Sequence, residues 1–169
     1  MPSFRKATHF DVPPLINENC RVLLLGSMLS PKSAEAGFYY AHPQNRFWRV
    51  MFALFDAPFS EDKDVRAQLA LDNGIALWDV LQSCDIEGAA DSTIKNAVYN
   101  DIAGLLARHP AVTRIYTTGG AAQKYLMRYN KTANDSVVAA AVALPSTSPL
   151  NCKASLDALI KAYSVIKNK

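Results

Sequence analysis

The feature that most constrains the fold is a short apolar run, RVLLLGS at residues 21–27, that ends in Gly-Ser. A strand formed here has no polar face, so it must be buried on both sides. Further runs of this kind occur at residues 74–80 (GIALWDV), 114–118 (RIYTT) and 137–144 (VVAAAVAL). Strands covered on both faces are typical of parallel sheets, in which helices connect successive strands.

The segments between these runs have the spacing or the end signals of helices. Apolar residues recur at helical intervals after Pro43. Further helices are expected over residues 60–71, 96–108, about 120–129 and 153–166. This alternation predicts an α/β protein, a three-layer α/β/α sandwich with a mostly parallel central sheet. We expect residues 1–20 to form an N-terminal extension and residues 21–169 to form a single domain.

Length and composition exclude several classes of protein. The 169 residues, half of them hydrophobic and a fifth charged, are typical of one soluble globular domain. The longest apolar run is too short to span a bilayer, and the first residues lack an apolar signal segment. Three widely separated cysteines predict neither a disulfide framework nor a zinc site. We therefore expect a cytoplasmic protein (nucleoid-associated if prokaryotic) that binds no metal and no membrane.

The charge is distributed unevenly along the chain. Residues 124–169 contain seven of the 18 Lys and Arg residues but only two of the 15 acidic residues. This bias indicates a face that prefers an anion. A solvated helix with a lysine-rich tail explains the same numbers equally well.

The carboxyl ends of parallel strands are where such sheets bind ligands. The expected strands place GSMLSPKS, the end of LWDV, TTGG and PSTSPLN on that one rim. TTGG matches neither GxGxxG nor a P-loop, so a tight strand-to-helix turn is favoured over nucleotide binding. Asp79 either forms a hydrogen bond in the site or caps a loop.

The turn PSTSPLN at residues 145–151 has the chemistry of a DNA contact. Hydroxyl and backbone N–H groups at Ser146 and Ser148 can bind a phosphate. Leu150 is an apolar residue in a polar turn, which suits a wedge between base pairs. In the alternative interpretation, Asn151 caps the last helix and Leu150 is its hydrophobic staple.

The stretch GFYYAHPQNRFW at residues 37–48 combines polar-tipped rings with an amide. When its histidine, His42, is considered alone, the favoured interpretation is a structural role. His9 lies in a terminal segment, and such segments are typically mobile.

These segments together resemble a known family. GSMLSPKSAEAGFYYAHPQNRFWRVM and LPSTSPLN resemble two motif regions of the uracil-DNA glycosylase superfamily, near the mismatch-specific uracil glycosylases and nearer the hypoxanthine-DNA (deoxyinosine) glycosylases. GIALWDVLQSC and DSTIKNAVYNDI are also similar to the hypoxanthine branch. The resemblance covers residues 22–163. It implies a monomeric enzyme without cofactor or metal that flips a deaminated base out of double-stranded DNA and hydrolyses its N-glycosidic bond.

The resemblance also implies roles for individual residues. Tyr40 would stack on the flipped base. The same pocket would be bordered by residues 26–28 (Gly26 to Met28) and by His42. Leu150 would fill the place that the base leaves. The remaining DNA contacts implied by the resemblance are Ser146, Thr147, Ser148 and Lys153, with Ser27 supplying backbone near the base.

One departure from the family concerns the catalytic amide. The mismatch-uracil branch carries a catalytic Asn just after the first strand's Gly, where this chain has Met28, which cannot orient water. In the hypoxanthine branch the amide lies in the HPxN run, which gives Asn45 here. Its carbonyl can hold water and its NH2 can bind a base carbonyl, whereas the alternative role is to cap the FWRVMF helix. The rival functions are a non-catalytic lesion-binding module and a small-nucleotide-binding α/β protein.

Overall fold

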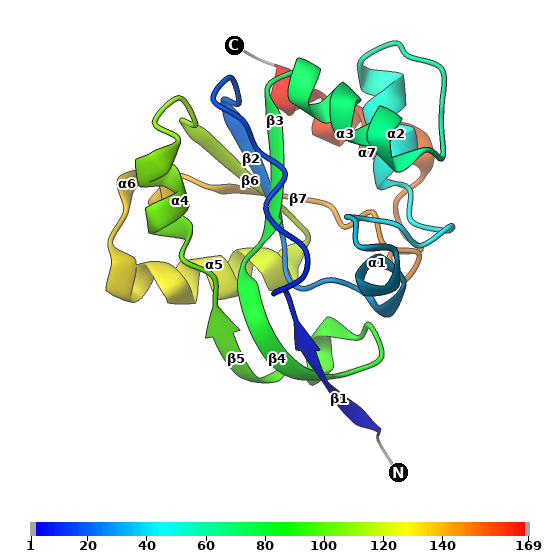
Figure 1. The fold of residues 1–169 in the computed structure, drawn as a ribbon. Coiled ribbons are helices and arrows are strands. Elements are labelled where there is room, and N and C mark those ends of the chain that lie inside the picture. Colours follow the sequence, from blue (N-terminus) through cyan, green and yellow to red (C-terminus); the bar gives the residue numbers. More distant parts are fainter. Residues whose placement is uncertain (1–2, 168–169) are drawn as a thin grey trace.

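A parallel four-stranded sheet forms the centre of the computed structural model, which describes residues 3–167. Its strands are β2 (Val22–Gly26), β3 (Ile75–Asp79), β6 (Arg114–Thr118) and β7 (Val142–Leu144), in the order β3-β2-β6-β7 (Figure 1). All three pairings are parallel. The expected α/β fold with a parallel central sheet is therefore confirmed.

Helices cover both faces of this sheet (Figure 1). One layer holds α2 (Phe47–Leu54), α3 (Lys63–Asp72) and α7 (Leu156–Tyr163), and the other holds α4 (Ile102–Arg108), α5 (Gly120–Ala133) and α6 (Ser136–Ala139). Successive residues of β2 point to opposite layers: Leu24 belongs to the core under α2 and α7, whereas Leu23 and Leu25 belong to the core under α4 and α5. The uniformly apolar run is thus explained by burial on both sides.

A second sheet, which the sequence did not predict, lies beside the first. Its strands are β1 (Phe4–Thr8), β4 (Leu81–Glu87) and β5 (Lys95–Tyr99), antiparallel and in the order β1-β4-β5. Only Val80 separates β3 from β4, so one extended stretch passes from the parallel sheet into the antiparallel one (Figure 1). Residues 4–8, within the expected extension, are therefore part of a sheet.

Two segments differ from their predicted secondary structure. Residues 96–108 form the end of β5 followed by α4, because the Asp101 side chain accepts from Gly104 N (3.0 Å) and caps the helix there. Residues 137–144 form α6 and then β7, because Asp135 accepts from the N–H groups of Val137 and Val138. In both cases an Asp side chain caps the first turn of a helix whose start the sequence did not predict. A short helix, α1 (Pro31–Ala36), follows β2, and two 3-10 turns, η1 (Asp91–Thr93) and η2 (Ser164–Lys167), complete the fold.

The strand register brings four chain segments to one rim. Gly26 is paired with Asp79, and Thr118 is paired with Leu144. Leu144 directly precedes the turn PSTSPLN at residues 145–151, here called the Ser-rich turn. The parallel pairing of β2 with β6 aligns these two pairs at the same end of the sheet. The loops predicted to meet are therefore neighbours. None of the helices within residues 3–167 is long and apolar enough to cross a membrane.

Replacing Leu24 with Ala should destabilise the fold, because its side chain is fully buried at the centre of the sheet (0% exposed). We expect the free energy of unfolding to fall by about 2–5 kcal/mol, measured by urea denaturation. Val142→Ala in β7, where the side chain is 53% exposed, is the matched control and should change stability by less than about 0.5 kcal/mol. Equal losses in the two variants would contradict the described core.

Candidate active site

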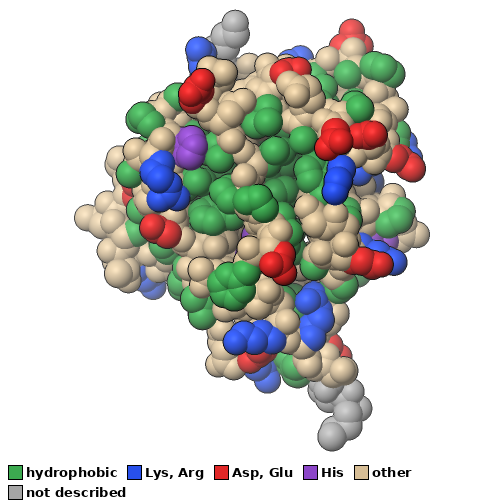
Figure 2. Space-filling view, in the orientation of Figure 1, with side chains coloured by type: hydrophobic (Ala, Val, Ile, Leu, Met, Phe, Trp, Pro, Cys, Tyr) green, Lys and Arg blue, Asp and Glu red, His purple; other side chains and the backbone are tan. Residues whose placement is uncertain are grey.

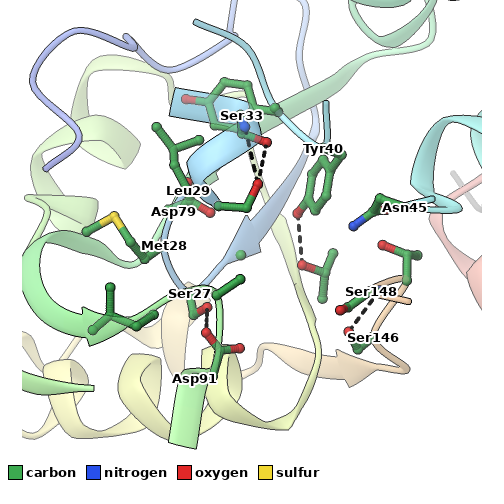
Figure 3. Close-up of a pocket in the computed structure, with 17 residues that line it drawn as sticks. Ser27, Met28, Leu29, Ser33, Tyr40, Asn45, Asp79, Asp91, Ser146 and Ser148 are labelled. Carbon is green, nitrogen blue, oxygen red and sulfur yellow. Dashed lines mark hydrogen bonds between the residues drawn. The ribbon is translucent and has the colours of Figure 1, made fainter. Parts of the chain in front are cut away.

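A pocket opens at the rim where β2, β3, β6 and β7 end (Figure 3). Its walls come from the loop after β2, the FYYAHPQN segment, the β4–β5 connection and the Ser-rich turn. Eight residues predicted for the site line it: Gly26, Ser27, Met28, Tyr40, Asn45, Ser146, Thr147 and Ser148. The pocket therefore gathers residues that lie more than 100 positions apart in the sequence.

Tyr40 is held in a conformation that an aromatic residue rarely adopts. Its φ is +54°, in the left-handed region, which costs of order 1 kcal/mol or more for a non-glycine residue. Its ring stacks on Phe47 with centroids 3.9 Å apart, and its hydroxyl is 2.8 Å from Thr118 Oγ1. One ring face is thus already covered, so a flat ligand could stack only on the other.

The backbone on each side of Tyr40 is also fixed by hydrogen bonds. Trp48 Nε1 donates to the carbonyl of Tyr39 (2.9 Å). The N–H of Ala41 donates to Ser33 Oγ (3.0 Å), and Ser33 is itself buried in α1. Burial raises the pKa of the Tyr40 hydroxyl well above its ordinary value, with the charge of Asp79 as the next cause, so this group stays protonated. The ring is therefore a rigid neutral wall.

Asn45 makes the capping contact, one of the two roles that the sequence left as alternatives, and it also lines the pocket. Its Oδ1 accepts from Phe47 N (2.9 Å) at the start of α2, which is a capping contact. Its Nδ2 forms no hydrogen bond within residues 3–167 and points toward Tyr40 (Figure 3). Because the backbone N–H fixes which end of the amide is oxygen, the group presents a free donor to the pocket. Its catalytic role stays a prediction.

The loop after β2 is tied to the opposite wall through Ser27. Its hydroxyl donates to Asp91 Oδ1 (2.7 Å) in η1 (Figure 3). Burial raises the pKa of the Asp91 carboxyl, the hydrogen bond from Ser27 lowers it, and the net shift is upward. Met28 lies beside this contact as an apolar part of the wall. Asp91 was not singled out from the sequence, because only the β4–β5 pairing brings it to this rim.

The Ser-rich turn is stabilised by its own side chains. Ser146 Oγ accepts from Ser148 N (3.1 Å), Ser148 Oγ accepts from Leu150 N (3.2 Å), and Asn151 Nδ2 donates to the Ser146 carbonyl (2.8 Å). The last helix begins only at Leu156, with Ser155 as its N-cap. The alternative in which Asn151 caps this helix is therefore wrong, and Leu150 projects outward, 73% exposed.

Arg46 connects the two motif regions directly. Its guanidinium donates to the carbonyls of Ala154 and, at 2.8 Å, Asn151. Its backbone N–H donates to the carbonyl of Thr147 (3.1 Å). The residue after Asn45 thus fixes the whole Ser-rich turn relative to the pocket.

Three predicted site residues do not line the pocket. Leu150 and Lys153 are exposed on the turn, where they would meet a long substrate rather than a single base. The ring of His42 accepts through Nδ1 from Gln44 N (3.1 Å), a local contact. Within residues 3–167, no group of three His, Cys, Asp or Glu side chains has an arrangement that could hold a metal.

The expectation that His9 is mobile is wrong. His9 and Asp79 are both 4% exposed, and His9 Nε2 lies 2.5 Å from Asp79 Oδ2. Burial lowers the pKa of His9, but the hydrogen bond and charge of Asp79, together with the Val12 carbonyl, outweigh it and raise the pKa above its ordinary value. Asp79 lines the pocket, so the first of its two proposed roles, a contact in the site, is the one its position favours.

The excess of Lys and Arg in residues 124–169 indicated either a face that prefers an anion or a solvated helix with a lysine-rich tail. On the face seen in Figure 2, Lys and Arg side chains are interspersed with Asp and Glu around hydrophobic patches. This face carries no extended patch of one sign. On this face, an anion would therefore be attracted by single side chains rather than by a basic patch.

Comparison with known proteins now identifies the family. The sequence profile of the Uracil DNA glycosylase superfamily matches residues 13–167, and this chain belongs to that superfamily. Two curated relatives, named Hypoxanthine DNA glycosylase, come from Methanosarcina acetivorans and Methanosarcina barkeri; each is 32% identical over 114 residues, 67% of this chain and 72% of the relative. The solution NMR structure of a Methanosarcina acetivorans protein matches with a TM-score of 0.76 and 25% identity, over 97% of this chain and 100% of that protein.

The His9–Asp79 pair should make stability depend on pH. The pKa of His9 in the folded protein is raised above the ordinary 6.5. The contribution of the protonated His9 to the free energy of unfolding is therefore fully present below about pH 6.5, and it is lost as the pH rises through the folded pKa. His9→Gln cannot titrate, so the difference in unfolding free energy between the two proteins should shrink from pH 6 to pH 9 in urea denaturation. Asp79, Asp91 and Tyr39, the other titratable groups nearby, are common to both proteins. A difference that stays constant across this range would contradict the assignment.

Proposed function

We propose that this protein is a DNA glycosylase that flips a deaminated base, above all hypoxanthine, out of double-stranded DNA and hydrolyses its N-glycosidic bond. Membership of the superfamily and the two relatives named Hypoxanthine DNA glycosylase support this proposal. The observation that carries it is the pocket itself: a rigid Tyr40 ring beside the free Nδ2 donor of Asn45. A flipped base needs such a stacking surface and a polar group for its Watson–Crick edge.

The chemistry follows from the charges that the reaction creates. When the bond from C1′ to the base nitrogen breaks, its electron pair leaves with the base and the sugar becomes positive. A donor at a base carbonyl stabilises the departing base, and water then adds to C1′. Asn45 suits both steps, because Nδ2 can donate to the carbonyl while the second lone pair of Oδ1 accepts from water.

The Ser-rich turn is the proposed contact with the DNA backbone. Ser146, Thr147 and Ser148 line the pocket, with Thr147 almost fully buried (1% exposed), whereas Lys153 is exposed and Leu150 projects from the turn. A projecting apolar side chain of this kind can occupy the gap that a flipped base leaves. We propose that the protein acts as a monomer; the cytoplasmic location expected from the cysteines stays a prediction.

The small-nucleotide alternative is weakened by the conformation of the TTGG turn. Gly119 has φ of +112°, and a Cβ there would lie 3.3 Å from Ser146 Cβ. The turn therefore serves to pack β6 and α5 against the Ser-rich turn. The non-catalytic alternative depends only on whether Asn45 supplies the missing amide.

The first substrate to test is a DNA duplex that contains one deoxyinosine. After the duplex has been incubated with the protein, alkali treatment converts the site of each released base into a strand break that can be measured. Asn45→Ala should lower the single-turnover rate roughly 100- to 1,000-fold with little change in DNA binding. Asn73→Ala, at the end of α3 and outside the pocket, is the matched control and should keep the full rate. Intact strands for deoxyinosine and deoxyuridine alike would refute the enzymatic proposal, and an unchanged Asn45→Ala rate would refute the role of that amide.

Leu150→Ala should reduce the rate on duplex DNA more than the rate on single-stranded DNA, because only a duplex must be held open after flipping. The side chain is 73% exposed, so thermal stability should be unchanged and serves as the internal control. Equal effects on the two substrates would show that Leu150 is not a wedge.

A further inference from the structure

The contact between His9 and Asp79 fixes where one proton lies. His9 Nδ1 is 2.8 Å from the carbonyl oxygen of Val12, and since a carbonyl can only accept, Nδ1 carries a hydrogen. His9 Nε2 and Asp79 Oδ2, 2.5 Å apart, must then share a second proton, because two lone pairs would repel at this distance. With that proton the pair has no net charge. The carboxylate is therefore held in one orientation and neutralised at the same time.

The second oxygen of Asp79 is left for the pocket. No hydrogen bond within residues 3–167 involves Oδ1, and Asp79 lines the pocket. The space beside it depends on Gly26, because a Cβ there would lie 2.4 Å from Oδ1 and 3.2 Å from the Tyr40 hydroxyl oxygen. Any other residue at position 26 would fill the place next to this acceptor. An acceptor without a donor, on a side chain that is only 6% exposed and lines a pocket, indicates that the donor belongs to a ligand.

The geometry points to Asp79 as the residue that selects deaminated bases, with Oδ1 accepting the ring N–H that deamination creates and His9 acting as its positioning residue. This inference rests on the proposed glycosylase function. Deamination of adenine replaces an amino group with a carbonyl, and the adjacent ring nitrogen then carries a hydrogen. Hypoxanthine thus offers a carbonyl to the Asn45 donor and an N–H to the Asp79 acceptor.

The same arrangement rejects the normal base. Adenine would present its amino group to the Asn45 donor and a ring lone pair to the Asp79 oxygen, so both contacts would be repulsive. Asn45 and Asp79 line the same pocket as Tyr40, the ring on which the base would stack. The shared proton serves the reaction as well, because an unpaired carboxylate would oppose the negative charge on the departing base.

The unmodified protein gives the first test. Duplexes containing 2′-fluoro-deoxyinosine, which resists cleavage, are compared with duplexes containing its N1-methyl derivative, in which the ring N–H is replaced. We expect the N1-methyl duplex to bind roughly 10- to 100-fold more weakly in a fluorescence titration. Equal affinities would overturn the inference. The folding of a variant cannot affect this comparison.

Variants then assign the effect to Asp79. Asp79→Leu removes the acceptor and should abolish the preference for deoxyinosine over its N1-methyl derivative. Asp79→Asn should keep a preference, because its Nδ2 can donate to His9 Nε2 and leave Oδ1 facing the pocket. Asp72→Leu, at an exposed site on α3, is the matched control and should behave as the wild type. A full preference in Asp79→Leu would overturn the assignment.

The positioning role of His9 is tested by the same ratio. His9→Leu should reduce the preference, and His9→Gln, which can still donate to Asp79, should restore most of it. A purely structural role would weaken binding of both duplexes equally and would leave the ratio unchanged. Failure of the proposed function can be told apart from failure of this inference. If the function fails, the wild type releases no base from deoxyinosine, whereas the ratio of the two binding affinities separately decides the role of Asp79.

Discussion

The parallel pairing of β2 with β3 on one side and β6 on the other is the constraint on which the rest of the structure depends. It buries four aliphatic residues between two helical layers and sets Gly26 beside Asp79 at the end of the sheet. Because β7 continues the same register from β6, the Ser-rich turn begins at that end too. The pocket thus arises where the most deeply buried strands stop, and the ends of those strands form its floor.

Hydrogen bonds and ring stacking then join segments that the sheet only brings near. Arg46 fixes the Ser-rich turn against the start of α2, and Ser33 and Trp48 hold the backbone around Tyr40. The unusual backbone of Tyr40 is sustained by these contacts and by Phe47. Strain at a site that is held from several directions is a feature of pre-organised pockets. Flipping a base is costly, so a wall that needs no rearrangement favours its capture.

Much of this arrangement could be predicted from the sequence. The apolar runs predicted the parallel sheet, and the carboxyl ends of the expected strands predicted which loops meet. Local patterns could not predict β5, since a strand at residues 95–99 is decided by pairing with β4, nor α6, which an Asp cap begins within a β-branched segment. His9 was missed for a similar reason. Its role depends on the pairing of β1 with β4, which carries a terminal histidine to a buried aspartate.

In the proposed complex, a deaminated base is held between Tyr40, Asn45 and Asp79. A crystal structure of the protein with a duplex containing 2′-fluoro-deoxyinosine tests this claim most directly. It should show the hypoxanthine ring on the free face of Tyr40, its carbonyl oxygen within hydrogen-bond distance of Asn45 Nδ2 and its N1 within hydrogen-bond distance of Asp79 Oδ1. A base that remains stacked in the duplex, or one held in the pocket without either contact, would contradict it.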